Sequence, residues 1–421
     1  MSIPVLEKFY EVPTPSVIAS VHEVERPRGG LRLGEAQENS EDVVQVELRY
    51  IAEGAANVIF SIEILGHAGK SKEDISPLCQ RLEGMLLRLR KGSQALPNIQ
   101  ENPTVPPPPF VPAQEIVKFI NERLPWSLTQ SFMVVHTLIQ IQPEVLQLCN
   151  ALLMTLEATN KRISKRRGWY LSAEETHGIL VTDMRPQKEG DITIEFKPKW
   201  LEQSPMAPDG ARRCRTCAWH VKNGVKASKR YCPLAIASLN RPQKRAHIAK
   251  FVPKADSLPD GWDYETVLNE FTSYFCDIDS GLQLLNRLRA AQKEYDPDGA
   301  LSAIGISDDN YSPEPTPELL ELVDSALQDS HNHGFLRLAC AMTLRDLIIF
   351  ARLSKAKTVD AVCIEGRIAD LDFKKVEAEK LLKWALDEAT LLRGGYYMGT
   401  ESRSDSDTAT KGDICFLWQQ T

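Results

Sequence analysis

Residues 43–64 alternate apolar and polar side chains on both sides of a short insert of small residues, from Glu53 to Asn57. Alternation places every second side chain on one face of an extended chain, so it predicts strands rather than a helix. An insert between two such runs predicts a hairpin. Residues 85–90 alternate again and predict a third strand. The N-terminal part of the chain is therefore expected to be rich in β-structure.

The spacing of apolar residues changes after a proline-rich connector at 97–113, which suits neither a helix nor a central strand. Apolar residues three and four positions apart predict helices at 114–123, 128–160, 262–293, 317–329, 335–355 and 374–392. Short apolar runs bounded by polar breaks predict strands at 178–183, 192–198 and 360–368.

A length of 421 residues allows two lobes. The order of elements predicts an α+β protein of two lobes, with the architecture of a kinase. A small β-rich lobe is expected at 1–185, and a larger, mainly helical lobe at 186–421 with a zinc-stabilised insertion and a mobile tail at 399–412.

Positive charge is concentrated in one segment of an otherwise acidic chain. Residues 161–254 contain 21 Lys or Arg against 8 Asp or Glu, although the whole chain carries a formal charge of −7. Such a segment indicates a polyanionic partner, which composition alone leaves open among nucleic acid, membrane and a phosphorylated small molecule. The alternative is a solvated basic face.

The chain shows no sign of export or membrane insertion. Its first residues, MSIPVLEKFYEVPTP, include an acidic residue and prolines where a signal peptide needs an unbroken apolar run. The longest apolar stretches, such as 132–141, are too short to cross a bilayer. Most of the nine cysteines are scattered singly, which suits a reducing compartment. We expect an intracellular monomer without a membrane partner.

Three cysteines and a histidine cluster in the basic segment. Cys214, Cys217, His220 and Cys232 have the ligand types and the number for a closed tetrahedral zinc site. His247 is an alternative fourth ligand. The competing interpretation is a group of free thiols beside a hydrogen-bonded histidine.

Two features of the predicted sheet suit phosphate binding. The small residues Gly54, Ala55, Ala56 and Asn57 let backbone N–H groups approach phosphate oxygens closely. The alternative is a plain hairpin turn, because alanine lacks the conformational freedom of glycine. Arg88, on the third strand, can supply a cation for nucleotide phosphates. Its alternative is a solvent-facing strand position.

Lys197 and Lys199 flank Pro198, which restricts this segment to an extended conformation. Two ammonium groups fixed in this way can bind two phosphates of one compact polyanion. The alternative is an ordinary charged strand end.

Asp346 lies in an apolar segment that is predicted to be helical. A carboxylate there needs a partner or a chemical role, and it can accept the proton of a substrate hydroxyl. The alternative is an ion pair with Arg345 or Arg352.

Asp370 and Asp372 directly follow the strand predicted at 360–368, and alternation points both to one side. That arrangement suits Mg²⁺ bound to ATP phosphates. The alternative is an acidic turn in which Asp372 caps a helix.

Taken in order, these segments resemble the inositol-pentakisphosphate 2-kinase family over about residues 50–375. The resemblance is carried by EGAAN (53–57), LLRLRK (86–91), ILVTDM (179–184), IEFKPK (194–199), CRTCAWH (214–220) with YCPL (231–234), AMTLRD (341–346) and ADLDFK (369–374). The IEFKPK and CRTCAWH–YCPL segments are distinctive of that family.

The resemblance implies a role for each matching position. Asp346 would be the catalytic base, and Asp370, with Asp372, would hold Mg²⁺. Nucleotide contacts would come from Gly54, Ala55, Ala56, Asn57, Arg88, Asp183 and Met184. Inositol phosphate contacts would come from Lys197, Lys199, Arg167, Arg215 and Lys374.

The implied reaction is ATP-dependent phosphorylation of the 2-hydroxyl of inositol 1,3,4,5,6-pentakisphosphate to give inositol hexakisphosphate (phytate). ATP, Mg²⁺ and a structural Zn²⁺ are implied, and the resemblance favours the nucleus over the cytoplasm. One alternative is a family member that binds inositol phosphates with little turnover. The other is a zinc-containing nucleic-acid-binding protein, which the scarcity of aromatic residues in the basic segment disfavours.

The chain also departs from the family pattern. The loop reads EGAAN where members commonly have EGGAN, and YCPLAI replaces YCPLDL. Lys375 stands where a proline often occurs. The paired asparagines and the arginine expected after YCPL are missing, so part of the substrate site is unassigned and the preference among inositol phosphates stays open.

Overall fold

A computed structural model describes most of the chain. The described residues are 16–24, 30–34, 43–67, 77–92, 110–125, 128, 131–306, 314–328, 334–356, 361–374, 376–400 and 415–419. Residues 97–109 of the predicted connector, Lys375 and residues 401–412 of the predicted tail lie outside them. The chain divides into two compact units, of which the first comprises Met1–Phe119 and Val134–Asp183 and the second Ile120–Met133 and Met184–Thr421.

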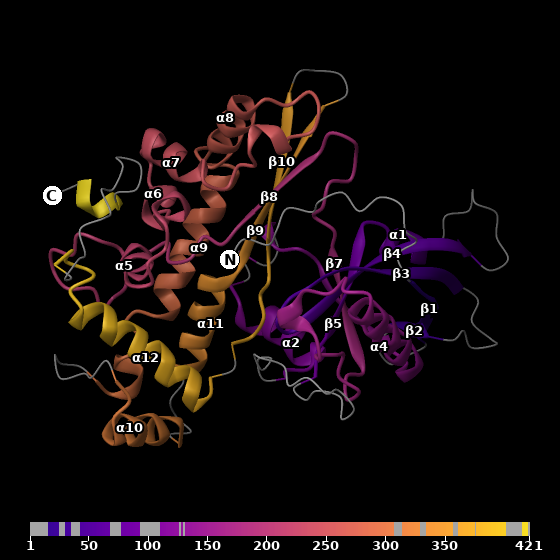
Figure 1. The fold of residues 1–421 in the computed structure, drawn as a ribbon, viewed down its shortest axis with the longest axis horizontal. Coiled ribbons are helices and arrows are strands. Elements are labelled where there is room, and N and C mark those ends of the chain that lie inside the picture. The colour runs from indigo at the N-terminus through magenta and orange to yellow at the C-terminus, as the bar shows by residue number, and fades with distance from the viewer. Residues whose placement is uncertain are drawn as a thin grey trace. The chain divides into compact units, whose positions relative to one another are not determined.

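Within its described residues, the first unit is a closed barrel of seven strands (Figure 1). The strands are β1 (Ser16–Val24), β2 (Gly30–Gly34), β3 (Val43–Glu53), β4 (Asn57–His67), β5 (Met85–Arg90), β6 (His136–Ile141) and β7 (His177–Thr182). Their order around the barrel is β1-β2-β6-β7-β5-β4-β3. The β2–β6 pair is parallel, and the other neighbours are antiparallel.

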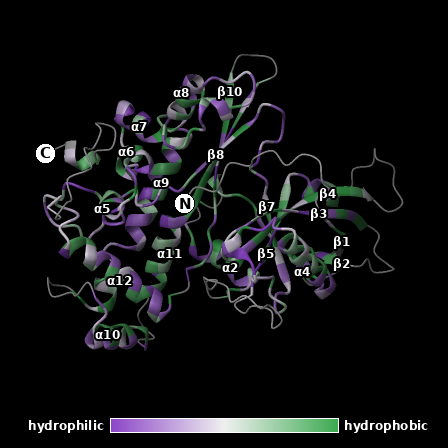
Figure 2. Ribbon diagram, viewed as in Figure 1, coloured by the Kyte–Doolittle hydropathy of each residue, from purple (hydrophilic) through white to green (hydrophobic). Residues whose placement is uncertain are grey.

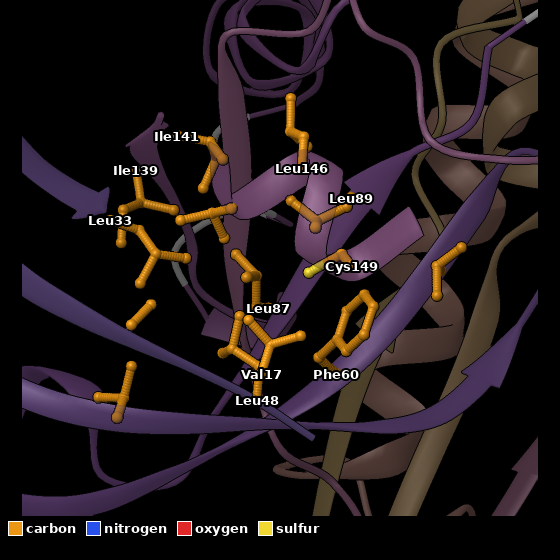
Figure 3. Close-up of a cluster of buried hydrophobic side chains, with 14 of the residues drawn as sticks. Val17, Leu33, Leu48, Phe60, Leu87, Leu89, Ile139, Ile141, Leu146 and Cys149 are labelled. Atoms are coloured by element: carbon orange, nitrogen blue, oxygen red, sulfur yellow. The ribbon is translucent and has the colours of Figure 1, made fainter. Parts of the chain in front are cut away.

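Alternation of side chains builds the barrel core. In β3, Val44, Val46 and Leu48 are fully buried, whereas Gln45 and Arg49 between and beside them are exposed. Figure 3 shows side chains from several strands pointing toward one another and toward α4. Bulky β-branched and leucine side chains fill this interior, as expected of a barrel whose inner face is closed to water.

Helix α4 (Pro143–Ala158) covers part of the barrel. Its buried residues recur at helical spacing, at Val145, Leu146, Cys149, Leu152, Leu153 and Leu156. Pro143 occupies its first turn, where the missing N–H removes no helical hydrogen bond. Helices α1 (Pro77–Leu82) and α2 (Ala113–Arg123) and the 3₁₀ turn η1 (Ser164–Arg166) complete the elements that begin in this unit.

The second unit combines a small sheet with many helices. Its described strands β8 (Ile192–Phe196), β9 (Ile348–Lys355) and β10 (Val362–Ala369) form an antiparallel sheet in the order β10-β9-β8. The helices are α5 (Arg215–Lys222), α6 (Pro233–Ala237), α7 (Arg241–Ile248), α8 (Tyr264–Tyr274), α9 (Gly281–Tyr295), α10 (Pro317–Gln328), α11 (Gly334–Asp346) and α12 (Ala378–Arg393). Short 3₁₀ turns are η2 (Ala227–Lys229), η3 (Ala255–Ser257), η4 (Ser302–Ile304) and η6 (Phe416–Gln419). Hydrophobic and hydrophilic residues share the same helices (Figure 2), as expected where each helix buries one face.

The mixed α+β composition is confirmed, with a β-rich barrel followed by a helical region. Three predicted helices are wrong in part. The segment 262–293 is divided into α8 and α9. The other two segments each contain a strand: β6 precedes α4 in 128–160, and β9 follows α11 in 335–355. Short apolar runs are ambiguous between helix and strand, and pairing with neighbouring strands decided both. Strands β1 and β2 were not predicted.

None of the helices in the described segments has the length and hydropathy needed to span a bilayer.

Candidate active site and metal centre

Three segments of the second unit converge at one end of its sheet. In the register of the sheet, Phe196 of β8 pairs with Ile349 of β9, and Ala369 of β10 pairs with Ile348. Lys197 and Asp370 therefore follow the ends of the two strands that flank β9. Asp346 is the last residue of α11, just before β9 begins. The sheet register thus gathers residues that are up to 173 positions apart in the sequence.

The side chains that meet there form a lysine–aspartate cluster, made of Lys197, Lys199, Lys374, Asp346 and Asp370. Oδ1 of Asp346 accepts hydrogen bonds from Lys199 Nζ at 2.9 Å and Lys197 Nζ at 3.2 Å. Its Oδ2 accepts one from Lys374 Nζ at 2.9 Å. Lys197 Nζ also lies 3.2 Å from Oδ2 of Asp370. Between 25% and 38% of each of these side chains is exposed, so the cluster is accessible to solvent.

The lysines control the charge of Asp346. Its partial burial alone would raise the pKa of the carboxyl group. The positive charges of Lys374, Lys199 and Lys197 outweigh burial and hold the pKa of Asp346 well below its usual range. Asp346 is therefore a carboxylate at every physiological pH.

Two residues of the cluster have an unusual backbone. Lys199 has φ 59° and Asp370 has φ 60°, which is the left-handed region that favours glycine. For a residue with a Cβ this conformation costs about 1–2 kcal/mol. Such strain often marks positions where the direction of a side chain matters for function.

Buried contacts hold the segment that carries the two lysines. The guanidinium groups of Arg345 and Arg215 both lie over the indole of Trp200, with their Cζ atoms 3.4 Å and 4.3 Å from the ring centroid. Arg215 Nε donates to Glu388 at 2.9 Å, and Arg345 pairs with Asp296. Arg215 is thus placed in a buried ion pair rather than in the lysine–aspartate cluster.

The alternative prediction, an ion pair of Asp346 with Arg345 or Arg352, is wrong. Arg345 pairs with Asp296, as stated above, and Arg352 pairs with Glu365 at 2.6 Å. Asp372 is half-buried, and its carbonyl oxygen accepts a hydrogen bond from the Thr343 hydroxyl at 3.3 Å.

A second cluster in this unit consists of four cysteines. The sulfur atoms of Cys214, Cys217, Cys232 and Cys415 all lie within 4.8 Å of one another. The Sγ atoms of Cys214 and Cys232 are 3.8 Å apart, and those of Cys232 and Cys415 are 3.7 Å apart. A tetrahedral zinc centre with bonds of about 2.3 Å separates its sulfurs by about 3.8 Å. These four cysteines therefore fit a closed zinc site.

Burial raises the pKa of the Cys214 thiol and hydrogen bonding raises that of Cys217, so the cluster concentrates thiolate character on Cys415. Hydrogen bonds from Cys214, Cys217 and Cys232 hold the pKa of Cys415 well below its usual range. The backbone N–H of Cys214 donates to the same sulfur at 3.1 Å. Cys214 is the N-cap of α5, where the helix dipole stabilises negative charge.

The predicted fourth ligand is wrong. Cys415, from the C-terminal segment, completes the set of four in place of His220 or His247. The ring of His220 packs edge-on against Tyr231, with centroids 5.4 Å apart. His247 Nδ1 accepts from the backbone N–H of Cys232 at 3.2 Å, so it supports a ligand rather than serving as one.

The cysteine cluster is joined to the lysine segment by Tyr231, the neighbour of Cys232. Its hydroxyl donates to the carbonyl oxygen of Lys197 at 2.6 Å. Phe251 packs against Tyr231 and stacks on Phe196, with centroids 4.9 Å and 4.6 Å apart.

In the first unit, the insert between β3 and β4 is anchored from inside by Glu53. Its carboxylate accepts from Arg162 Nε at 2.9 Å and Nη2 at 2.8 Å, and also from Lys91. Lys91 Nζ also donates to the carbonyl of Gly54 at 3.1 Å. The side chains of Glu53, Lys91 and Arg162 are completely buried. Ala55 is exposed and Ala56 is half-buried.

The remaining candidates of this unit are placed as follows. Asn57 Oδ1 accepts from Arg90 Nη1 at 2.8 Å. Arg88 is only 5% exposed, so the alternative of a solvent-facing position is wrong. Asp183 is buried at the end of the first unit, and Met184 begins the second. Arg167 follows η1 and is half-buried.

Sequence reasoning missed three residues that organise these sites. Cys415 lies 183 positions after Cys232, so no spacing rule could connect them. The sequence marks Glu53 only as the first residue of the insert, because its buried partners Lys91 and Arg162 are 38 and 109 positions away. Gln292 of α9 bonds to the lysine segment from a helix that carried no recognisable motif.

Comparison with known proteins agrees with the motifs. The family model described as inositol-pentakisphosphate 2-kinase matches residues 50–390. The inositol-pentakisphosphate 2-kinase of Yarrowia lipolytica is 28% identical over 205 residues, which are 49% of this chain and 53% of that protein. The chain thus spans about half the length of the curated relative it matches. Because the family match extends over most of the chain, this protein belongs to the inositol-pentakisphosphate 2-kinase family.

Proposed function

We propose that this chain transfers the γ-phosphoryl group of ATP to the 2-hydroxyl of inositol 1,3,4,5,6-pentakisphosphate, giving inositol hexakisphosphate. The observation that carries the proposal is the lysine–aspartate cluster, found at the positions that match the family's motifs. Three ammonium groups within 3.2 Å of two carboxylates form a site in which a polyphosphate and a reacting hydroxyl can be held together.

The lysines are the groups that would bind substrate phosphates. Lys197, Lys199 and Lys374 each donate a hydrogen bond to an aspartate. A phosphate carries more negative charge than a carboxylate and offers three acceptor oxygens, so it competes well for an ammonium group. Substrate phosphates would therefore draw the lysines away from Asp346.

This exchange of partners prepares Asp346 for its role. Each lysine that moves to a phosphate removes positive charge from the carboxylate, so the pKa of Asp346 rises toward its ordinary value. Asp346 becomes a better proton acceptor when the substrate is bound. It would then orient the 2-hydroxyl for in-line attack and take its proton, with positioning supplying most of the rate.

Each unit contains residues that we assign to the nucleotide. Carboxylate oxygens are preferred ligands of Mg²⁺, and Asp370, which is about a third exposed, and Asp372 are the candidates for them. Mg²⁺, when bound, screens the charge of the ATP phosphates. We assign phosphate contacts to the loop Gly54–Asn57 and to Arg88, and adenine contacts to the stretch around Asp183 and Met184.

The remaining assignments are also part of the proposal. The functional lobes are 1–185, which carries the phosphate loop, and 186–421, which carries the inositol phosphate site, as in a kinase. Arg167 is assigned to the substrate. Arg215 was predicted to bind substrate as well, but its pairing with Glu388 favours a supporting role. Zn²⁺ held by the four cysteines would be structural.

The test is a Mg²⁺–ATP kinase assay with inositol 1,3,4,5,6-pentakisphosphate. The wild-type protein should form hexakisphosphate, and Asp346→Asn should lower kcat by about 100-fold or more. Asp324→Asn, on the exposed face of α10, is the matched control and should retain activity. Absence of product from folded, metal-replete wild type would overturn the proposal. Tight hexakisphosphate binding without transfer would instead identify a binding protein.

A further inference from the structure

Gln292 of α9 is completely buried, and its side chain connects two segments that are distant in the sequence. Its Nε2 donates to the carbonyl oxygen of Lys199 at 2.9 Å and to that of Leu344 at 3.0 Å. Its Oε1 accepts from the backbone N–H of Leu201 at 2.9 Å. One side-chain amide thus holds three backbone groups.

Both segments carry side chains of the lysine–aspartate cluster. Lys199 is itself one of the held residues, and Leu344 lies in the last turn of α11, two positions before Asp346. The two side chains meet at 2.9 Å, between Lys199 Nζ and Asp346 Oδ1. Gln292 therefore fixes the separation of the two backbones from which this contact is made.

The chemistry of the bridge requires an amide. Two N–H donors and a carbonyl acceptor on one planar group match two backbone carbonyls and one backbone N–H. The carbonyl of Leu344 is among the last four of α11, which a helix leaves without a partner of its own. The bridge also supports Lys199 in its left-handed conformation, at φ 59°.

We propose that Gln292 is a positioning residue for substrate binding, which fixes the backbone position from which the Lys199 side chain reaches a phosphate of the inositol phosphate beside Asp346. Without the bridge, the Lys199 backbone would relax toward an extended conformation and carry its ammonium group away from Asp346. The inference rests on the proposed function of the lysine–aspartate cluster. It concerns a residue that touches neither the substrate nor the nucleotide.

Two substitutions separate the parts of the bridge. Gln292→Glu keeps the acceptor for Leu201 but loses the donors to both carbonyls. Gln292→Asn keeps donors and acceptor on a shorter side chain that reaches fewer partners, and it leaves the core uncharged. Leu288→Ala is the control, because Leu288 is fully buried on the same helix and one turn away. It should lower thermal stability without touching the bridge.

The measurements are steady-state kinetics with inositol 1,3,4,5,6-pentakisphosphate and with ATP, together with hydrogen exchange of the Leu201 amide. Both Gln292 variants should raise KM for the inositol phosphate about tenfold or more, because small misplacements of binding groups are costly. KM for ATP should be unchanged, and the Leu201 amide should exchange faster, most of all in Gln292→Asn. Leu288→Ala should change neither KM.

The outcomes separate this inference from the function on which it rests. An unchanged KM for the inositol phosphate in folded Gln292 variants, or an equal rise in Leu288→Ala, would overturn the positioning role. Lack of phosphoryl transfer by the wild type would overturn the proposed function. Even then, unchanged exchange of the Leu201 amide in both Gln292 variants would show that the bridge does not hold this segment.

Discussion

Replacement of Glu53 by glutamine tests whether buried charge anchors the proposed phosphate loop. Glu53 accepts hydrogen bonds from Lys91 and Arg162, and all three side chains are completely buried. The substitution keeps the shape of the side chain but leaves Lys91 without its carboxylate partner, whereas Arg162 keeps Glu157 at 2.7 Å. Removal of one partner from a buried ion pair typically costs about 3–5 kcal/mol. We expect Glu53→Gln to lower the free energy of unfolding of the barrel by this amount.

The assay is urea-dependent hydrogen exchange of peptides from β3 and β5, which reports the free energy of unfolding of this unit. The control is Glu63→Gln, also on the barrel. Glu63 pairs with Arg49 at 2.9 Å, and about half of each side chain is exposed. An exposed pair contributes about 0–1 kcal/mol, so the control should be nearly neutral.

The loss of unfolding free energy in Glu53→Gln should also depend on pH. Burial lowers the pKa of Lys91 to about 8 even with Glu53 beside it, from an ordinary value of 10.5. Without Glu53 the pKa of Lys91 falls further, so above it the unfolded state binds more protons than the folded state. Stability of the variant then rises with pH, and its deficit should shrink up to about pH 8. Above that pH Lys91 also loses its proton in the folded wild type, so both proteins gain stability alike and the deficit stays constant. A deficit equal to that of Glu63→Gln, or independent of pH, would refute the buried-charge explanation.

Further predictions concern the second unit. Lys197→Ala removes one of the positive charges that lower the pKa of Asp346. The acid limb of the pH profile of kcat/KM should therefore lie at higher pH than in the wild type. An unchanged acid limb would contradict this electrostatic coupling. Cys415→Ser should release zinc to a chelator faster than the wild type by direct metal analysis, whereas the exposed Cys363→Ser should not; equal retention would exclude Cys415 as a ligand. Tyr231→Phe removes the hydrogen bond to the carbonyl of Lys197, which is worth about 1 kcal/mol, so KM for the inositol phosphate should rise about fivefold with KM for ATP unchanged. A change in both constants would indicate a general loss of structure.

The parts of the site that could be predicted from the sequence are those with a local signal. Lys197 and Lys199 stand in a short motif around a proline, and Asp346 is a charged residue in an apolar run. The structure brings these three residues together. Their meeting depends on the pairing of β8, β9 and β10, because hydrogen bonds between strands bring together residues that are far apart in the sequence.

The wrong predictions for the strand β9 and for the fourth metal ligand also have a physical cause. The run IIFARLSK has apolar residues at spacings that continue the pattern of α11, so the sequence predicts a helix there. Its alternating burial appears only once β9 lies between β8 and β10. His220 was preferred as a metal ligand because it is close in sequence to Cys217. Cys415 reaches the same cluster through tertiary packing, for which spacing gives no signal.

The central claim is the site of phosphorylation. The most direct measurement is ³¹P NMR of the product formed from Mg²⁺–ATP and inositol 1,3,4,5,6-pentakisphosphate by the metal-replete protein. A pentakisphosphate isomer whose free hydroxyl is at another ring position serves as the comparison. We predict inositol hexakisphosphate from the first substrate and no phosphoryl transfer to the second. Equal transfer to both isomers, or transfer to neither, would contradict the assignment of the lysine–aspartate cluster to the 2-hydroxyl.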